Sequence, residues 1–147
     1  MLQRLAGSAL VLLLAFVLGG CGDNDGKLRT KGRLLKGGEE FIPDEDENIQ
    51  ITFVPIMPDG KPPHRHYYAD VNQETGEFVP DGPDKKGLPA GRYRVAVELM
   101  KKKKDLFKGR FDQEASPFIF DIDEDTEEIV IDLDKPPLYA PKPVAGG

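Results

Sequence analysis

The sequence predicts an all-β protein, a single antiparallel β-sandwich of about seven strands. Three observations lead to this prediction. Several segments alternate apolar and polar side chains with a period of two, which is typical of strands with one buried and one exposed face. Clusters of Gly, Pro, Asp and Asn separate these segments, as expected for turns. No segment shows a helical period or a strand–helix–strand rhythm, so an α/β fold is not expected.

Four segments show the clearest alternation, and their predicted inward-facing positions are Ile49, Ile51 and Phe53; Tyr93, Val95, Val97 and Leu99; Phe118, Phe120 and Ile122; and Ile129, Ile131 and Leu133. Weaker strand candidates cover residues 28–35, 67–71 and 77–79. The expected turns are Pro58-Asp59-Gly60, Glu74-Thr75-Gly76, Asp81-Gly82-Pro83 and Pro89-Ala90-Gly91. We expect Gly76 to adopt a positive φ, Gly91 to permit a tight turn into its strand, and Phe78 to anchor the next strand in the core.

The first twenty residues form an apolar leader. Arg4 precedes the apolar run of residues 9–18, which is shorter than the roughly 20 residues of a membrane-spanning helix and is typical of a signal peptide. The next residues, Leu18-Gly19-Gly20-Cys21, resemble the lipobox of bacterial lipoproteins. This resemblance implies a signal peptide at residues 1–20, cleavage before Cys21, and lipid on the Cys21 thiol and amine. Residues 21–26 are then the acylated cysteine and a short polar tether.

Cys21 is the only cysteine, so no intramolecular disulfide is expected. The alternative interpretations are an ordinary secretory signal with a chance cysteine, or a structural thiol. Lipidation would place the protein in the cell envelope, anchored to a bacterial membrane with its domain on the extracytoplasmic side. In lipoproteins an Asp directly after the cysteine suggests retention in the inner membrane. Gly22 occupies that position, so both the inner and the outer membrane remain open.

The rest of the chain divides into a sandwich domain at residues 27–134 and a Pro- and Gly-rich tail at residues 135–147, which we expect to be extended and disordered. The whole chain has a formal net charge of −6. Removing residues 1–20, whose only charged side chain is Arg4, leaves −7. Nucleic acid is therefore not an expected partner, because phosphate contacts need Lys and Arg.

A resemblance to a known family appears in Leu88-Pro89-Ala90-Gly91-Arg92-Tyr93-Arg94-Val95-Ala96-Val97, which is similar to a segment of carboxypeptidase-regulatory-like domains. Residues 51–55, and residues 68–71 followed by 74–78, are similar to other strands of that family. The resemblance implies a transthyretin-like (prealbumin-like) sandwich with accessory, structural or binding roles on secreted proteins. It brings no catalytic residues and no cofactor. The acidic insertion at residues 39–47 and the pair Asn72-Gln73 depart from the family pattern.

Candidate catalytic residues are few. After Cys21 the chain has one serine, Ser116, which directly precedes a proline. A catalytic triad would have to combine it with His64 or His66 and an orienting acid. We expect Ser116 to be a turn residue instead, and we predict that the protein is not an enzyme.

Two groups of residues have a spacing that is compatible with metal binding. His64 and His66 would share one face of an extended strand and reach one metal with help from Asp70 or Glu77, although a solvated loop is the favoured interpretation. Asp121, Asp123 and Asp125 have the 1-3-5 spacing of a calcium loop. However, Thr126 replaces the glycine of that loop and the bidentate Glu is missing. A solvated hairpin turn is favoured there, and no cofactor is predicted.

Lys101, Lys102, Lys103 and Lys104, followed by Lys108 and Arg110, form a basic patch. Near an anionic membrane each Lys would contribute about 1 kcal/mol of attraction. The favoured alternative is a solvated loop that discourages strand pairing. The run also has a potential intramolecular partner in the acidic segment 39–47.

These observations predict a membrane-anchored envelope lipoprotein that acts as a non-catalytic binding or structural module. Its partners would be the membrane, through the lipid, and a protein or envelope polymer. The alternative is a metal-dependent binding or catalytic protein that uses the region of His64 and His66. A carrier of small apolar ligands has little support, since apolar residues are few. The ligand and the oligomeric state stay open at this point.

Overall fold

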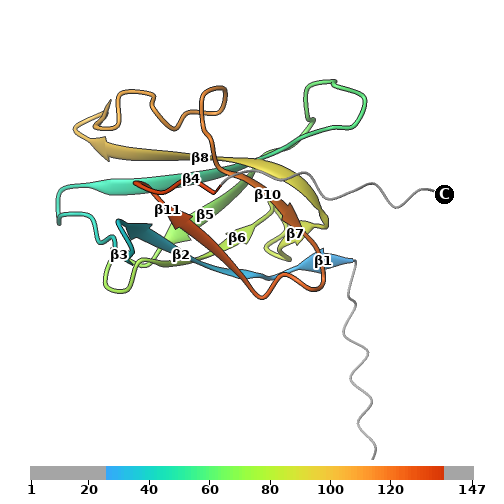
Figure 1. The fold of residues 1–147 in the computed structure, drawn as a ribbon, viewed down its shortest axis with the longest axis horizontal. Coiled ribbons are helices and arrows are strands. Elements are labelled where there is room, and N and C mark those ends of the chain that lie inside the picture. Colours follow the sequence, from blue (N-terminus) through green and yellow to red (C-terminus); the bar gives the residue numbers. More distant parts are fainter. Residues whose placement is uncertain (1–25, 138–147) are drawn as a thin grey trace, which may run out of the picture.

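The computed structural model describes residues 26–137. All regular secondary structure in this part of the chain is β, which confirms the predicted fold class (Figure 1). The strands are β1 (Lys27–Leu28), β2 (Lys31–Lys36), β3 (Glu39–Glu40), β4 (Asn48–Pro55), β5 (Tyr67–Val71), β6 (Glu77–Asp81), β7 (Leu88–Pro89), β8 (Gly91–Lys101), β9 (Lys104–Asp105), β10 (Ile119–Ile122) and β11 (Glu128–Asp132). Of the two-residue strands, β3 pairs with β2 and β9 pairs with β8, whereas β1 and β7 pair with each other as a separate two-stranded sheet.

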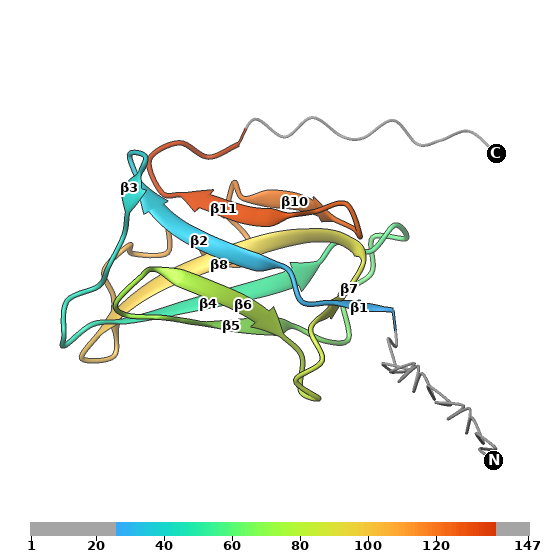
Figure 2. The same ribbon diagram turned by 90° about the horizontal axis from the view of Figure 1, so that it is seen from below.

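Seven strands form the body of the fold, hydrogen-bonded in the order β10-β8-β4-β5-β6-β2-β11. The sheet bends back on itself, so that β2 and β6 pass in front of β8 and β4 in Figure 2. The buried apolar side chains form one cluster to which strands of both halves contribute. The arrangement is sandwich-like, and the longest strand, β8, pairs with β4 along eight residue positions.

One pairing differs from the antiparallel expectation. β11 lies parallel to β2, with Glu128 opposite Lys31 and Asp132 opposite Leu35. The turn before β11 is therefore not the hairpin that the sequence suggested, because β10 pairs with β8 at the other end of the strand order. Alternation predicts which face of a strand is buried, but it carries no information on the partner or its direction.

The predicted inward-facing side chains are buried, with one exception. Ile49, Ile51, Phe53, Tyr93, Val95, Val97, Leu99, Phe118, Ile122, Ile129, Ile131 and Leu133 are all in the core. Phe120 is only partly buried and packs against this core from the outside. Thr52 of β4 and Ala96 of β8 lie on the face that points away from these core side chains, and they are also buried. β4 and β8 are therefore covered on both faces over part of their length.

The expectations for the two glycines had different outcomes. Gly76 has a φ of +69°, as predicted for its turn, and Phe78 after it is buried. Gly91 needs no such freedom: its φ is not in the positive range, and an added Cβ would lie 3.7 Å from the Tyr93 ring, which is an ordinary contact. β8 does begin at Gly91, but the turn before it does not require a glycine at this position.

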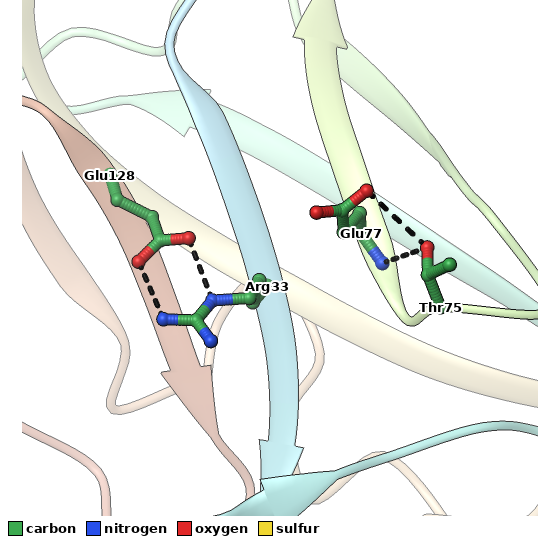
Figure 3. A network of polar contacts seen from close by, with 4 residues as sticks. All are labelled: Arg33, Thr75, Glu77 and Glu128. Carbon is green, nitrogen blue, oxygen red and sulfur yellow. Dashed lines mark hydrogen bonds and ion pairs between the residues drawn. The ribbon is translucent and has the colours of Figure 1, made fainter.

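Polar side chains form one contact between neighbouring strands and one within a turn (Figure 3). Across the parallel pair, Arg33 Nε and Nη2 donate to the two carboxylate oxygens of Glu128 at 2.7 and 2.8 Å. In the turn before β6, the backbone N–H of Glu77 donates to Thr75 Oγ1 at 3.3 Å. The first contact joins residues that are 95 positions apart, and the second fixes a local turn.

Candidate binding groove

An open groove of about 1050 Å³ lies at one end of the sandwich. Its lining comes from the end of β4, the start of β5, the start of β8 and the end of β10. Tyr67, Tyr93 and Ile122 belong to it and are buried residues of the core. Pro55, Ile56, Met57, Pro58 and Pro63 add further apolar surface.

The loop of residues 56–66, which joins β4 to β5, contributes most of the exposed lining. It leaves β4 in a fixed direction because the N–H of Ile56 donates to the carbonyl of Arg92 at 2.8 Å. A turn follows, in which the N–H of Gly60 donates to the carbonyl of Met57 at 3.0 Å. The Met57 side chain stays 39% exposed. In both ribbon views this loop lies at the same end of the molecule as β1 and β7 (Figures 1 and 2).

An ion pair forms part of the groove lining. Arg92 Nε donates to Asp121 Oδ1 at 2.8 Å, and Arg92 Nη2 lies 3.4 Å from Asp121 Oδ2. Both residues line the groove, and their backbones are opposite each other in the β8–β10 pair. The antiparallel register therefore creates this two-point contact, which a guanidinium and a carboxylate favour.

Tyr93 has a structural role beneath the groove. Its hydroxyl donates to the carbonyl of Pro89 at 2.6 Å. Burial raises the pKa of this phenol well above its ordinary value, so it stays neutral and acts as a hydrogen-bond donor. Its ring packs edge-on against Tyr67 and Phe53, with ring centroids 6.0 and 6.2 Å away. A catalytic tyrosinate is therefore not expected at this position.

The structure brings together candidates that the sequence assigned to separate metal sites. His64, in the loop between β4 and β5, lines the groove together with Asp121 and Asp123. The two aspartates lie at the end of β10 and directly after it, and this end of β10 pairs with the start of β8. Asp121 already pairs with Arg92. The Asp123 carboxylate accepts hydrogen bonds from Thr126 Oγ1 at 3.0 Å and from the N–H of Asp125 at 3.2 Å.

His66 and Asp125 are the remaining metal candidates. His66 is half-buried immediately before β5, and Asp125 is exposed in the turn before β11; neither lines the groove. Within residues 26–137, ligand atoms of at least three such side chains gather within 4.8 Å only at Asp44, Asp46 and Glu47. Both sequence-based metal sites therefore stay predictions.

The basic patch lies at the opposite end of the sandwich from the groove, since β8 runs from one end to the other. Lys101 Nζ lies 2.8 Å from Asp46 Oδ1 and 3.6 Å from Glu47 Oε1, which confirms that the acidic segment pairs with the lysine run. This hydrogen bond with Asp46 raises the pKa of Lys101. Lys102 and Lys103 form an exposed turn that leads into β9.

Ser116 is buried and is occupied by backbone contacts. Its hydroxyl donates to the carbonyl of Val95 and accepts from the N–H of Phe118 at 3.3 Å. It therefore fastens the segment before β10 to β8. Ser116 is also absent from the groove lining, which contains no serine, threonine, cysteine or lysine among the described residues.

Sequence reasoning missed a second, smaller groove of about 690 Å³ on the outer face of β5 and β6. Tyr68 lines it and is 60% exposed. Polar side chains surround this ring: Lys31, Asp70, Asn72, Glu77, Asp81 and Lys85. The signal was present in the pair Tyr67-Tyr68, because alternation sends one ring inward and the other outward.

The predicted lipidation site, Cys21, and most of the predicted tail lie outside the described residues. Within residues 26–137, no helix is long and apolar enough to cross a membrane.

Comparison of the chain with protein-family models, with curated proteins and with solved structures finds no match.

Proposed function

We propose that this protein is a bacterial envelope lipoprotein whose β-sandwich, of the carboxypeptidase-regulatory-like type, is a non-catalytic binding or structural module. Two sequence features support the proposal: the segment Leu18-Gly19-Gly20-Cys21 behind an apolar leader, and the strand motifs around Tyr93. The described domain begins six residues after Cys21, so the tether would be short.

The groove is the observation that carries a binding role. It is large enough for a small molecule or a short polymer segment, and it combines apolar walls with a few polar groups, as binding sites usually do. Its described lining has no nucleophile of the serine, threonine or cysteine type. The arrangement therefore favours recognition over covalent chemistry.

The anchor is tested by feeding radiolabelled palmitate to cells that express the full chain. We expect the label to enter the protein and the protein to sediment with membranes. Cys21→Ala should abolish both, whereas Asn24→Ala in the tether should change neither. Label that persisted in Cys21→Ala would rule out the proposed anchor.

The groove is tested by placing a photo-crosslinking amino acid at Met57 in intact membranes. Leu106 is the matched control, since it is similarly exposed, at 42% against 39%, and follows β9 at the other end of the sandwich. We expect an envelope component to be captured at Met57 and not at Leu106. Identical adducts from both positions would contradict a specific role for the groove.

A metal-dependent role is the second candidate, because His64, Asp121 and Asp123 line one groove. Elemental analysis of the purified protein tests this alternative. Stoichiometric zinc, copper or calcium that is lost in His64→Ala and retained in His66→Ala, whose side chain does not line the groove, would support it. If no metal is retained and none raises the melting temperature, the metal hypothesis is wrong.

A further inference from the structure

We infer that the groove is a membrane-docking surface: the groove end of the sandwich rests on the lipid bilayer, with Met57 at the boundary between headgroups and acyl chains. This inference rests on the proposed lipid anchor at Cys21. It goes further by assigning the groove to lipid and by giving the domain one orientation on the membrane.

The first strand after the tether, β1, lies at the edge of the groove. β1 pairs with β7, and this pairing puts Lys27 opposite Pro89. Pro89, Ala90 and Gly91 line the groove. The tether therefore joins the domain at the edge of the groove, and both ribbon views show β1 at the same end as the loop of residues 56–66 (Figures 1 and 2).

The tether is shorter than the sandwich is long. Five residues lie between Cys21 and Lys27, so the six Cα–Cα steps of the tether span at most about 20 Å when fully extended. β8 has eleven residues, which corresponds to about 35 Å at the usual rise per residue. A lipid on Cys21 would hold the groove end near the bilayer, while the far end of β8 would extend away from it. The basic patch at Lys101–104 would then face away from the membrane.

The loop of residues 56–66 combines apolar and basic side chains. Ile56, Met57 and Pro58 present apolar surface at its start, and His64 and Arg65 follow as exposed basic side chains. Interfacial segments combine an apolar face that enters the acyl boundary with basic side chains at the level of the phosphates. Residues 56–66 contain one acid, Asp59, which pairs with Lys61 at 3.0 Å and leaves Arg65 as the remaining cation of the loop. In the groove lining, the carboxylate of Asp121 is paired with Arg92.

The experiment uses tryptophan fluorescence, because the chain contains no tryptophan of its own. Met57→Trp and Leu106→Trp are made in the full lipidated protein and reconstituted in vesicles of phosphatidylcholine and phosphatidylglycerol. The vesicles carry a quencher on the lipid acyl chains. We expect the Met57→Trp emission to shift to the blue and to lose most of its intensity, while the Leu106→Trp emission stays unchanged.

Two readouts separate failure of this inference from failure of the anchor. If palmitate is incorporated but Met57→Trp is not quenched, the groove does not face lipid and the inference falls while the anchor stands. If palmitate is not incorporated, the anchor itself has failed. A blue shift without quenching would show a non-lipid occupant in the groove and would also overturn the inference.

The contribution of charge is tested by adding Arg65→Glu to Met57→Trp. We expect quenching to decrease on vesicles that contain phosphatidylglycerol and to be unchanged on pure phosphatidylcholine. Lys104→Glu, in the distant basic patch, is the matched control and should change neither. An equal effect of Arg65→Glu and Lys104→Glu would contradict docking through the groove end.

Discussion

Gly87 shows how the fold depends on a single residue that the sequence did not single out. Its φ is +94°, and a Cβ at this position would lie 2.1 Å from the carbonyl oxygen of Leu28. Its N–H donates to Asp81 Oδ1 at 2.7 Å. The close approach results from the pairing of β1 with β7, which places Leu28 opposite Leu88. A side chain at Gly87 would therefore disturb the place where the tether joins the domain.

We expect Gly87→Ala to lower the free energy of unfolding by about 1–3 kcal/mol or more, because both φ and the available space exclude a methyl group. Urea denaturation measures this loss. Gly91→Ala is the matched control and should change stability by less than about 0.5 kcal/mol. Equal midpoints for the two variants would show that the backbone at Gly87 does not have this conformation.

Lys102 and Lys103 occupy the two central positions of the β8–β9 hairpin, where Lys101 pairs with Lys104. Both have positive φ, +49° and +66°. Two-residue hairpins with two such angles favour Asn-Gly, because side chains with a Cβ disfavour this region. Lys102 and Lys103 therefore occupy backbone conformations that lysine disfavours.

We expect the double change Lys102→Asn with Lys103→Gly to raise the free energy of unfolding by about 1 kcal/mol. Thermal or urea unfolding measures the gain. Lys104→Gly removes a charge of the same kind from a strand position without positive φ, and it should lower stability. A double variant less stable than the original chain would contradict the relief of backbone strain.

At the scale of elements, β11 closes one edge of the seven-strand order. Its residues alternate strictly: Ile129 and Ile131 are buried, and Val130 between them is 37% exposed. Only β2 forms a ladder with it among the described strands, so its stability comes from one parallel pairing and from the inward side chains. The packing of those side chains therefore decides whether the strand stays attached.

We expect Ile131→Ala to lower the free energy of unfolding by about 3 kcal/mol, which is usual when a buried aliphatic side chain is replaced by alanine. Val130→Ala, one position away on the outer face, should cost less than about 1 kcal/mol. Urea denaturation of both variants tests the assignment. If Val130→Ala were the more damaging change, the register of β11 would be shifted by one residue.

At the scale of the whole molecule, exposed ion pairs make stability depend on pH; two of them, Lys27 with Asp84 and Arg33 with Glu128, join distant parts of the chain, and Lys61 with Asp59 is local. Hydrogen bonds with Lys61, Lys27 and Arg33 lower the pKa values of Asp59, Asp84 and Glu128, respectively. A carboxyl group with a lowered pKa in the folded state stabilises the fold above its ordinary pKa, and this contribution is lost as the pH falls through the folded value. The ordinary values are 3.8 for Asp and 4.5 for Glu.

We therefore expect the melting temperature to be nearly constant from about pH 7 to pH 5.5 and to fall below about pH 5. Glu128→Gln should make this fall shallower, because it removes one of the responsible groups. Arg33→Gln should have the same effect, since it removes the partner that lowers the Glu128 pKa. Melting curves across this pH range provide the measurement, and unchanged slopes in both variants would refute the assigned linkage.

The sequence by itself predicted the β class, the strands of the core and the burial of nearly every inward-facing side chain. These properties follow from a period of two, which is local and can be read from adjacent residues. It also suggested a pairing between the lysine run and the acidic segment, and Lys101 with Asp46 confirms it. Phe120 marks where this local reasoning ended, because its surroundings include β8, which lies elsewhere in the chain.

Only the tertiary structure decided the order of the strands, the parallel pairing of β11 with β2, and the groove. These depend on contacts between segments that are distant in sequence, such as Arg33 with Glu128, and a local pattern does not encode the choice of partner. The groove exists because the ends of β4, β8 and β10 meet at the end of the sandwich where β1 joins the fold. His64 and Asp121, separate in the sequence, thereby come to line a single surface.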